Sequence, residues 1–111
     1  DNHWPSEWQR GVLDLCVLHI LADGPTYGYS IAARLTDAGF ADVKGGTLYP
    51  LLKRLEGAGL VDVEWRPGEA GPGRKFYLIN TAGRQRLMAL TASWQRYSTT
   101  VTRLLDEGSP S

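Results

Sequence analysis

Residues 45–66 read GGTLYPLLKRLEGAGLVDVEWR, and the spacing of their apolar side chains changes within the segment. Leucines first recur every three or four residues, which predicts a helix with one apolar face. Pro50 lies in its first turn, where a missing N–H costs little, and the GAG sequence then ends the helix. Across residues 61–66, apolar and charged side chains alternate, which predicts a strand. The apolar face of the predicted helix consists of Leu48, Leu51, Leu52 and Leu55.

A second strand follows this first one after a short loop. Residues 67–73 hold two prolines and three glycines, with no apolar side chain beyond Ala70, so we expect a turn or a flexible loop there. Residues 75–79 read KFYLI, which is typical of a strand. Two short strands around such a loop make a β-hairpin.

A helix is expected at the beginning of the chain. Ser6 and Gln9 have the spacing of a capping box, which predicts that this helix starts near Glu7. Apolar side chains then recur at helical spacing until the Gly24-Pro25 pair ends the segment. These apolar positions are Val12, Leu13, Cys16, Ile20 and Leu21.

A further helix is expected between this one and residue 45. Thr26 can cap it, and it should run to about Ala38, where Gly39 stops it. The predicted order is therefore helix, helix, helix, strand, strand, helix. This order predicts a mainly α fold with a small β-hairpin, which is the winged helix-turn-helix. We expect residues 1–80 to form it as a single domain.

The last helix is expected over residues 81–106, with Thr81 as its cap and residues 107–111 as a disordered tail. Its apolar side chains are separated by alternating gaps of three and four residues, which is a heptad pattern. About 25 residues also give a rod of roughly 37 Å, longer than so small a domain needs. We expect this helix to pair with a second copy around a two-fold axis. The alternative is that it only covers the core of its own domain. The seam consists of Leu87, Leu90, Trp94, Tyr97, Val101 and Leu104.

The composition is that of an ordinary globular domain of 111 residues, with 42% apolar and 22% charged residues. No apolar run approaches the roughly 20 residues of a membrane span, and the one cysteine cannot form an internal disulfide, so a cytoplasmic location fits best. The formal net charge is zero, yet residues 66–103 hold seven basic residues against one acidic residue. A neutral chain can therefore present a basic face.

Such a face would suit DNA. In a helix-turn-helix, the second helix of the motif enters the major groove, and here it is the third helix of the chain. Its outward side chains and the cations of the hairpin can contact bases and phosphates, and Tyr27 opens the helix before it. For Tyr29, packing and DNA contact are equally good interpretations. The predicted DNA-binding residues are Tyr27, Thr47, Tyr49, Lys53, Arg54, Arg66, Arg74 and Lys75.

Four segments together resemble the PadR family of bacterial transcriptional regulators. They are RGVLDL (10–15), GPTYGYSIA (24–32), GTLYPLLKRLE (46–56) and GRKFYL (73–78), and the similarity covers residues 10 to about 105. The resemblance implies a winged-helix repressor that dimerises through its C-terminal helix and is often released from its promoter by a small aromatic effector. The one short C-terminal helix is similar to that of the smaller subfamily.

Some members of that subfamily bind planar drugs between tryptophans at the dimer centre, and Trp94 occupies a similar place. The resemblance therefore implies an effector site at Trp94, with Tyr97 on the adjacent turn. A tryptophan at a seam position also favours a cleft, because its ring is too large to interdigitate with its symmetry mate. The alternative is that Trp94 packs against the first helix of its own chain.

Other constellations in the sequence are weak. Residues 68–75 resemble a phosphate loop, but a strand rather than a helix follows them. Cys16 and His19 are three residues apart on one helix, yet two ligands make no closed metal site, and a core cysteine beside a half-buried histidine is favoured. No nucleophile–histidine–acid set is evident, so we expect neither an enzyme nor a cofactor. The alternative function is a winged helix that binds only other proteins.

Overall fold

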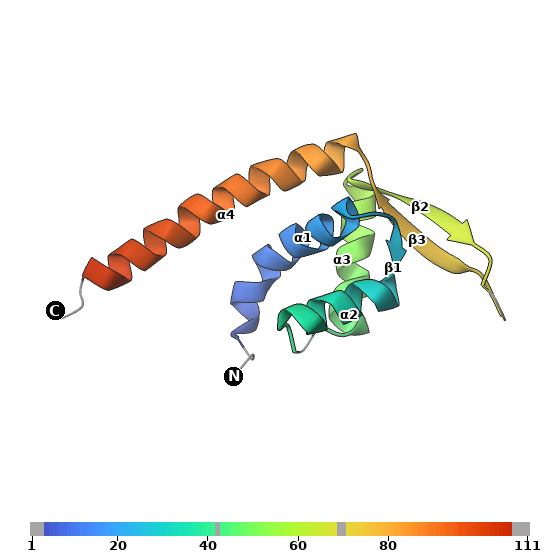
Figure 1. Cartoon of the computed structure of the whole chain (residues 1–111), viewed down its shortest axis with the longest axis horizontal. Coiled ribbons are helices and arrows are strands. Elements are labelled where there is room, and N and C mark those ends of the chain that lie inside the picture. Colours follow the sequence, from blue (N-terminus) through green and yellow to red (C-terminus); the bar gives the residue numbers. More distant parts are fainter. Residues whose placement is uncertain (1–3, 42, 69–70, 108–111) are drawn as a thin grey trace.

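The structure is a computed structural model, and it describes residues 4–41, 43–68 and 71–107. The predicted winged helix-turn-helix with a long last helix is confirmed, and one short strand is added to it (Figure 1). In chain order the elements are α1 (Ser6–Ala22), β1 (Thr26–Tyr27), α2 (Gly28–Ala38), α3 (Gly45–Gly57), β2 (Val61–Arg66), β3 (Arg74–Ile79) and α4 (Thr81–Glu107).

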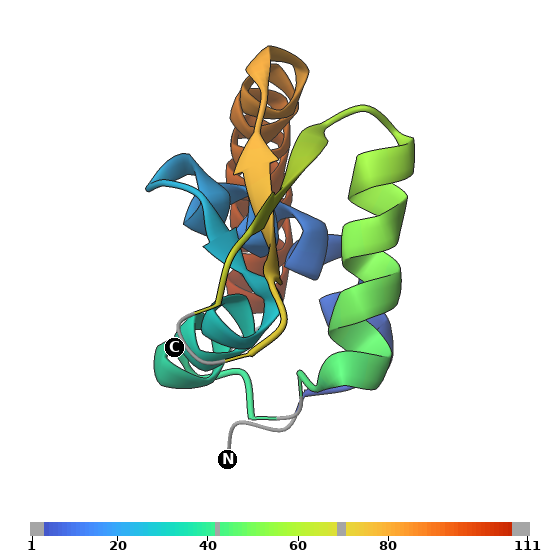
Figure 2. The same ribbon diagram turned by 90° about the vertical axis from the view of Figure 1, so that its right-hand side faces the viewer.

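The first three helices form a compact body around one apolar core. The β2–β3 hairpin projects from this body on one side, and α4 runs past α1 and extends on the other side (Figures 1 and 2). The leucines predicted for the apolar face of α3 are all buried, as the helical period requires. The largest fully buried side chains are Val17, Leu18, Leu21, Ile31, Leu35, Leu48 and Leu52.

The sheet has three strands in the order β1-β3-β2, all antiparallel. The expectation that Thr26 caps the second helix is wrong, because Thr26 and Tyr27 form β1 and pair with Tyr77 and Phe76 of β3. The free edge of β3 offers hydrogen-bond partners to this segment, and threonine and tyrosine both favour strands. Helix α2 therefore begins only at Gly28.

Two other helix starts also differ from the predicted caps. Helix α1 begins at Ser6 after Pro5, and no side chain caps it, so the predicted capping box does not form. At the start of α4, Asn80 takes the role expected of Thr81, since its Oδ1 accepts a hydrogen bond from the N–H of Gly83 at 2.8 Å. The Nδ2 of Asn80 also donates to the carbonyl of Gly59 at 2.9 Å, which connects the helix start to the turn between α3 and β2.

Gly83 sets the close approach between α4 and the start of β2. It is buried, and a Cβ atom at this position would overlap the carbonyl oxygen of Leu60 and lie 2.7 Å from Cγ1 of Ile79. Real Cβ atoms do not come so near to a backbone oxygen, so a larger residue would push the helix away. The direction in which α4 leaves the body therefore depends on this glycine.

The two halves of α4 have different surroundings. Leu87 and Leu90 of the predicted seam pack against the core of their own chain. From Trp94 onward, the seam side chains are exposed. Helix α4 ends at Glu107, one residue beyond the expected end, and residues 108–111 of the expected tail lie outside the described residues. The exposed seam residues are Trp94, Tyr97, Val101 and Leu104.

Replacing Gly83 with alanine should lower the free energy of unfolding by about 1–3 kcal/mol, because the added methyl group overpacks the contact with Leu60. The measurement is urea unfolding at one fixed protein concentration. The control is Gly57→Ala in α3, where an added Cβ meets no atom within 4 Å, and its stability should equal or slightly exceed that of the parent. Equal unfolding midpoints for the two variants would contradict the role given to Gly83.

Candidate nucleic-acid interface

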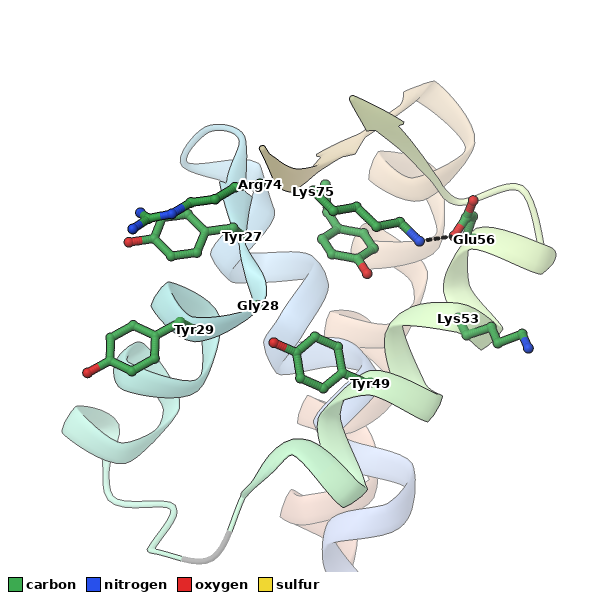
Figure 3. A pocket seen from close by; sticks show the side chains of 9 residues that line it. Tyr27, Gly28, Tyr29, Tyr49, Lys53, Glu56, Arg74 and Lys75 are labelled. Carbon is green, nitrogen blue, oxygen red and sulfur yellow. Dashed lines mark hydrogen bonds and ion pairs between the residues drawn. The ribbon is translucent and has the colours of Figure 1, made fainter. Parts of the chain in front are cut away.

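An open recess lies where the start of α2, the outer face of α3 and the base of the hairpin meet, and we call it the recess (Figure 3). Its volume is about 870 Å³. Tyrosines and cations make up most of its lining, and Glu56 contributes the one carboxylate. The lining residues are Tyr27, Gly28, Tyr29, Tyr49, Lys53, Glu56, Arg74, Lys75 and Tyr77.

Tyr49 closes the gap between α2 and α3. A Cβ atom on Gly28 would lie 2.6 Å from the Tyr49 hydroxyl oxygen and 2.7 Å from its ring, so the tyrosine can hold this position only while residue 28 has no side chain. Gly28 is buried beneath the ring, whereas Tyr49 remains 52% exposed on its outer side. The two most distinctive sequence motifs, GPTYGY and GTLYP, thus meet in space at this contact.

Cations and aromatic rings alternate across one face of the sheet. The guanidinium of Arg74 lies 4.6 Å from the ring centre of Tyr27, and that of Arg66 lies 4.3 Å from the ring centre of Phe76. The two rings are themselves 5.4 Å apart. Both arginines are therefore held by cation–π contacts, which favour a cation placed over the face of a ring. Arg66 also donates from Nε to a carboxylate oxygen of Glu64 at 2.8 Å.

Two lysines contribute positive charge from different elements. The Nζ of Lys75 lies 3.4 Å from a carboxylate oxygen of Glu56, so this lysine connects the hairpin to α3. In Figure 3 the side chain of Lys53 points away from the protein, one turn of α3 before Glu56. Among the residues that the structure describes, Lys53 has no ion pair. Its charge is therefore available to an anionic partner.

The recess brings together most of the predicted DNA-binding residues, but not all of them. Arg54 turns toward α1, where its guanidinium lies 2.5 Å from a carboxylate oxygen of Asp14. Thr47 is exposed at the start of α3 without lining the recess. Arg66 lies beside the hairpin loop, next to a separate hollow that it shares with Arg74. The residues that meet in the recess are Tyr27, Tyr49, Lys53, Arg74 and Lys75.

The structure adds residues that the sequence did not assign to this surface. Tyr29, for which two interpretations were open, is 76% exposed at the rim of the recess. Glu56 and Tyr77 complete the lining. The helical period alone places Glu56 on the same side of α3 as Lys53, three residues earlier, but an acidic residue was not expected on a DNA-binding face.

A second hollow of about 470 Å³ is lined by residues of both α1 and α4, and we call it the α1–α4 groove. Trp94 stands beside the first helix of its own chain here and is still 42% exposed. Trp8 of α1 lines the same groove, which places two indole rings around one hollow. The groove is lined by Glu7, Trp8, Gly11, Val12, Leu15, Leu90, Ser93, Trp94 and Tyr97.

Cys16 and His19 have unlike surroundings. Cys16 is half-buried, and burial raises the pKa of its thiol above the ordinary value. His19 is exposed, so the expectation of a half-buried histidine is wrong. Within residues 4–41, 43–68 and 71–107, no three histidine, cysteine or acidic side chains gather as a metal would require. None of the helices in these ranges is both long and apolar enough to cross a membrane.

Comparison with known proteins places this geometry in a family. Residues 17–89 match the Transcriptional regulator PadR-like family. A transcriptional regulator of Mycobacterium tuberculosis, Rv3488, is 40% identical over 81 residues, which are 73% of this chain and 74% of that protein.

Solved structures share the fold. The PadR-like transcriptional regulator of Bacillus cereus superposes with a TM-score of 0.80 at 36% identity, over 89% of this chain and 96% of the other. The PadR family regulator of Eggerthella lenta gives a TM-score of 0.80 at 37% identity, over 89% and 86% of the two chains. The resemblance found in the sequence is thus confirmed, and the chain belongs to the PadR-like family of transcriptional regulators.

Proposed function

We propose that this chain is a repressor that binds operator DNA as a homodimer and leaves it when a planar aromatic effector binds. The observation that carries the DNA-binding part is the recess, in which Lys53, Arg74 and Lys75 from α3 and the hairpin face one open surface. Family membership supports DNA binding, because PadR-like proteins are transcriptional regulators.

Helix α3 is suited to the major groove. Its N-terminal end is exposed at Thr47 and Tyr49, and the N-terminal residues of a recognition helix are those that contact base edges. Lys53 lies one turn further on, where it can neutralise a phosphate. The hairpin beside α3 supplies Arg74 and Lys75 for the DNA backbone.

The dimer is supported by the second half of α4. Tyr97 and Leu104 are 66% and 67% exposed, and with Trp94 and Val101 they continue the heptad spacing that Leu87 and Leu90 begin. A contiguous exposed apolar stripe of this kind marks a protein-interaction surface. A two-fold axis at α4 would pack the stripe of one copy against the stripe of the other. It would also hold the two α3 helices at a fixed spacing that can match two half-sites.

The effector is proposed to bind in the α1–α4 groove. Trp8 and Trp94 offer two aromatic walls, and stacking on a planar guest contributes roughly 0.5–1.5 kcal/mol per ring beyond the buried area. Tyr97 lies one turn from Trp94 and can contact a phenolic or anionic substituent. Because α4 would also form the dimer interface, a guest beside it would change the angle between the two copies and hence the spacing of the α3 helices.

DNA binding should depend on the lysines of the recess. The Lys53→Ala variant should bind its own upstream DNA more weakly and should flatten the salt dependence of the logarithm of affinity by about one unit per half-site, because one phosphate contact is lost. Lys75→Ala should weaken binding further, since it leaves the carboxylate of Glu56 unpaired beside the DNA. Gel shifts over a series of salt concentrations measure both effects.

The control for this experiment is Arg103→Ala, which removes an exposed cation from α4 far from the recess and should leave the salt dependence unchanged. A double variant that lacks both Lys53 and Lys75 but binds like the parent would contradict the assignment of the recess. If the parent binds no DNA, the alternative of a protein-interaction module would take its place.

The dimer should dissociate when a charge enters the stripe of α4. Leu104→Asp should shift the sedimentation coefficient to that of a monomer, because an unpaired carboxylate would be buried in the interface. Thr99→Asp places the same charge on the opposite side of α4 and should remain dimeric. Circular dichroism should show that both variants retain their helices, and a dimeric Leu104→Asp protein would refute this interface.

Effector binding should be visible in the tryptophan emission. Titration with an acridine dye, as a planar aromatic probe without DNA present, should quench the parent, and Trp94→Ala should abolish the quench. Trp65→Phe removes an indole outside the groove and should leave the titration curve almost unchanged. An unaltered curve for Trp94→Ala would place the dye elsewhere.

A further inference from the structure

The hairpin carries one large aromatic side chain that the core does not use. Trp65 is the fifth residue of β2 and is 69% exposed. The alternation along β2 places it on the same face as Val61, which is buried, and Val63, which is half-buried. The apolar face of β2 therefore continues beyond the core and ends in an indole ring that is open to solvent.

Cross-strand pairing fixes the direction in which this ring faces. Trp65 is paired with Lys75 of β3, and paired residues in an antiparallel sheet share one face. The side chain of Lys75 reaches Glu56 of α3. Trp65 therefore occupies the face of the hairpin that looks toward α3. Its ring also lies by the loop, since a Cβ atom on Gly73 would be 3.9 Å from Cε3 of the indole.

The surroundings of Trp65 are cationic. Lys75 stands opposite it on the same face of the hairpin. Arg66 and Arg74 form the next pair along the hairpin and point to the other face, where Arg66 also contacts Glu64. A single exposed apolar residue needs no explanation on its own. Here, however, the exposed ring lies on a projecting hairpin that carries cations on both faces, with Lys75 on the face of the ring and two arginines on the other, beside the helix proposed to enter the major groove. Apolar surface flanked by cations matches the deoxyribose and base edges of DNA between its phosphate strands.

We propose that Trp65 enters the DNA minor groove next to the major groove that α3 occupies. This inference rests on the proposed DNA-binding function and names a contact that the cations alone do not provide. The minor groove is about 6 Å wide, which excludes a helix but admits the edge of a flat ring. The indole packs on sugars and base edges and partly unstacks a base step, as apolar wedges do in other minor-groove proteins, while Arg66 and Arg74 neutralise the adjoining phosphates.

The first test uses affinity and its salt dependence together. Trp65→Ala should weaken operator binding about tenfold, in the range measured for aromatic contacts with bases. The slope of the logarithm of the affinity against the logarithm of the salt concentration should not change, because the substitution removes no cation and alters no counterion release. Trp65→Phe keeps an aromatic wedge and should recover most of the affinity. Met88→Ala, which truncates another exposed apolar side chain on α4, should bind like the parent.

The second test changes the DNA instead of the protein. Replacing G·C pairs under the hairpin with inosine·C pairs removes the 2-amino group from the minor groove and leaves the major-groove pattern intact. The parent should bind this DNA more tightly, since the groove becomes deeper, whereas Trp65→Ala should not distinguish the two duplexes. The pairs to replace are those at the edge of each half-site in a footprint of the parent protein.

The outcomes separate this inference from the proposed function. If Lys53→Ala weakens binding but Trp65→Ala binds like the parent, DNA binding stands and the ring serves another partner, so the inference is overturned. If the Trp65→Ala variant binds operator DNA more weakly and its affinity also depends less on salt, a lost phosphate contact explains the loss and the inference is again overturned. If the parent binds no DNA, both fail. Because Trp65 is exposed, its variants should unfold at the temperature of the parent, and Trp65→Phe provides the comparison if Trp65→Ala does not fold.

Discussion

The contact between the Tyr49 ring and the backbone of Gly28 shapes the recess that is proposed to face DNA. The ring of Tyr49, from α3, lies directly against the first residue of α2, and both elements contribute to the recess. A side chain at residue 28 would displace the half-exposed ring from this contact and would change the shape of the recess. The pairing of β1 with β3 lies directly beside this contact, because β1 leads into α2, and it joins the start of α2 to the hairpin.

The periodic parts of the sequence predicted the fold well, and the helix ends lie close to their predicted positions, but the groups that cap the helix starts were predicted less well. Leucine spacing identified α3, and alternation identified β2, because burial on one side of an element imposes a period on the residues of that element. The residues before α2 and α4 form contacts with partners that are distant in sequence. Thr26 joins a strand because β3 has a free edge, and Asn80 caps α4 while also bonding to Gly59. The residues next to Thr26 and Asn80 in the sequence do not indicate either partner.

The same distinction applies to the candidate site. The sequence predicts which positions of a helix point outward. It does not predict which neighbouring element an outward side chain contacts. Lys53 and Arg54 are adjacent and both exposed, yet Lys53 lines the recess, while Arg54 pairs with Asp14, forty residues earlier in the chain. On α4, likewise, the heptad pattern was visible without a break. Only the packing shows that Leu87 and Leu90 belong to the core of their own chain and that the pattern is open from Trp94 onward.

The cations that rest on aromatic rings have a thermodynamic consequence. A free arginine side chain samples many rotamers, and ordering it on a partner costs roughly 0.5–1.5 kcal/mol of conformational entropy. The contacts of Arg74 with Tyr27 and of Arg66 with Phe76 restrict these side chains before any partner arrives. Part of this entropy loss therefore occurs during folding, so a larger share of the attraction between these two guanidinium groups and a polyanion is retained as net affinity.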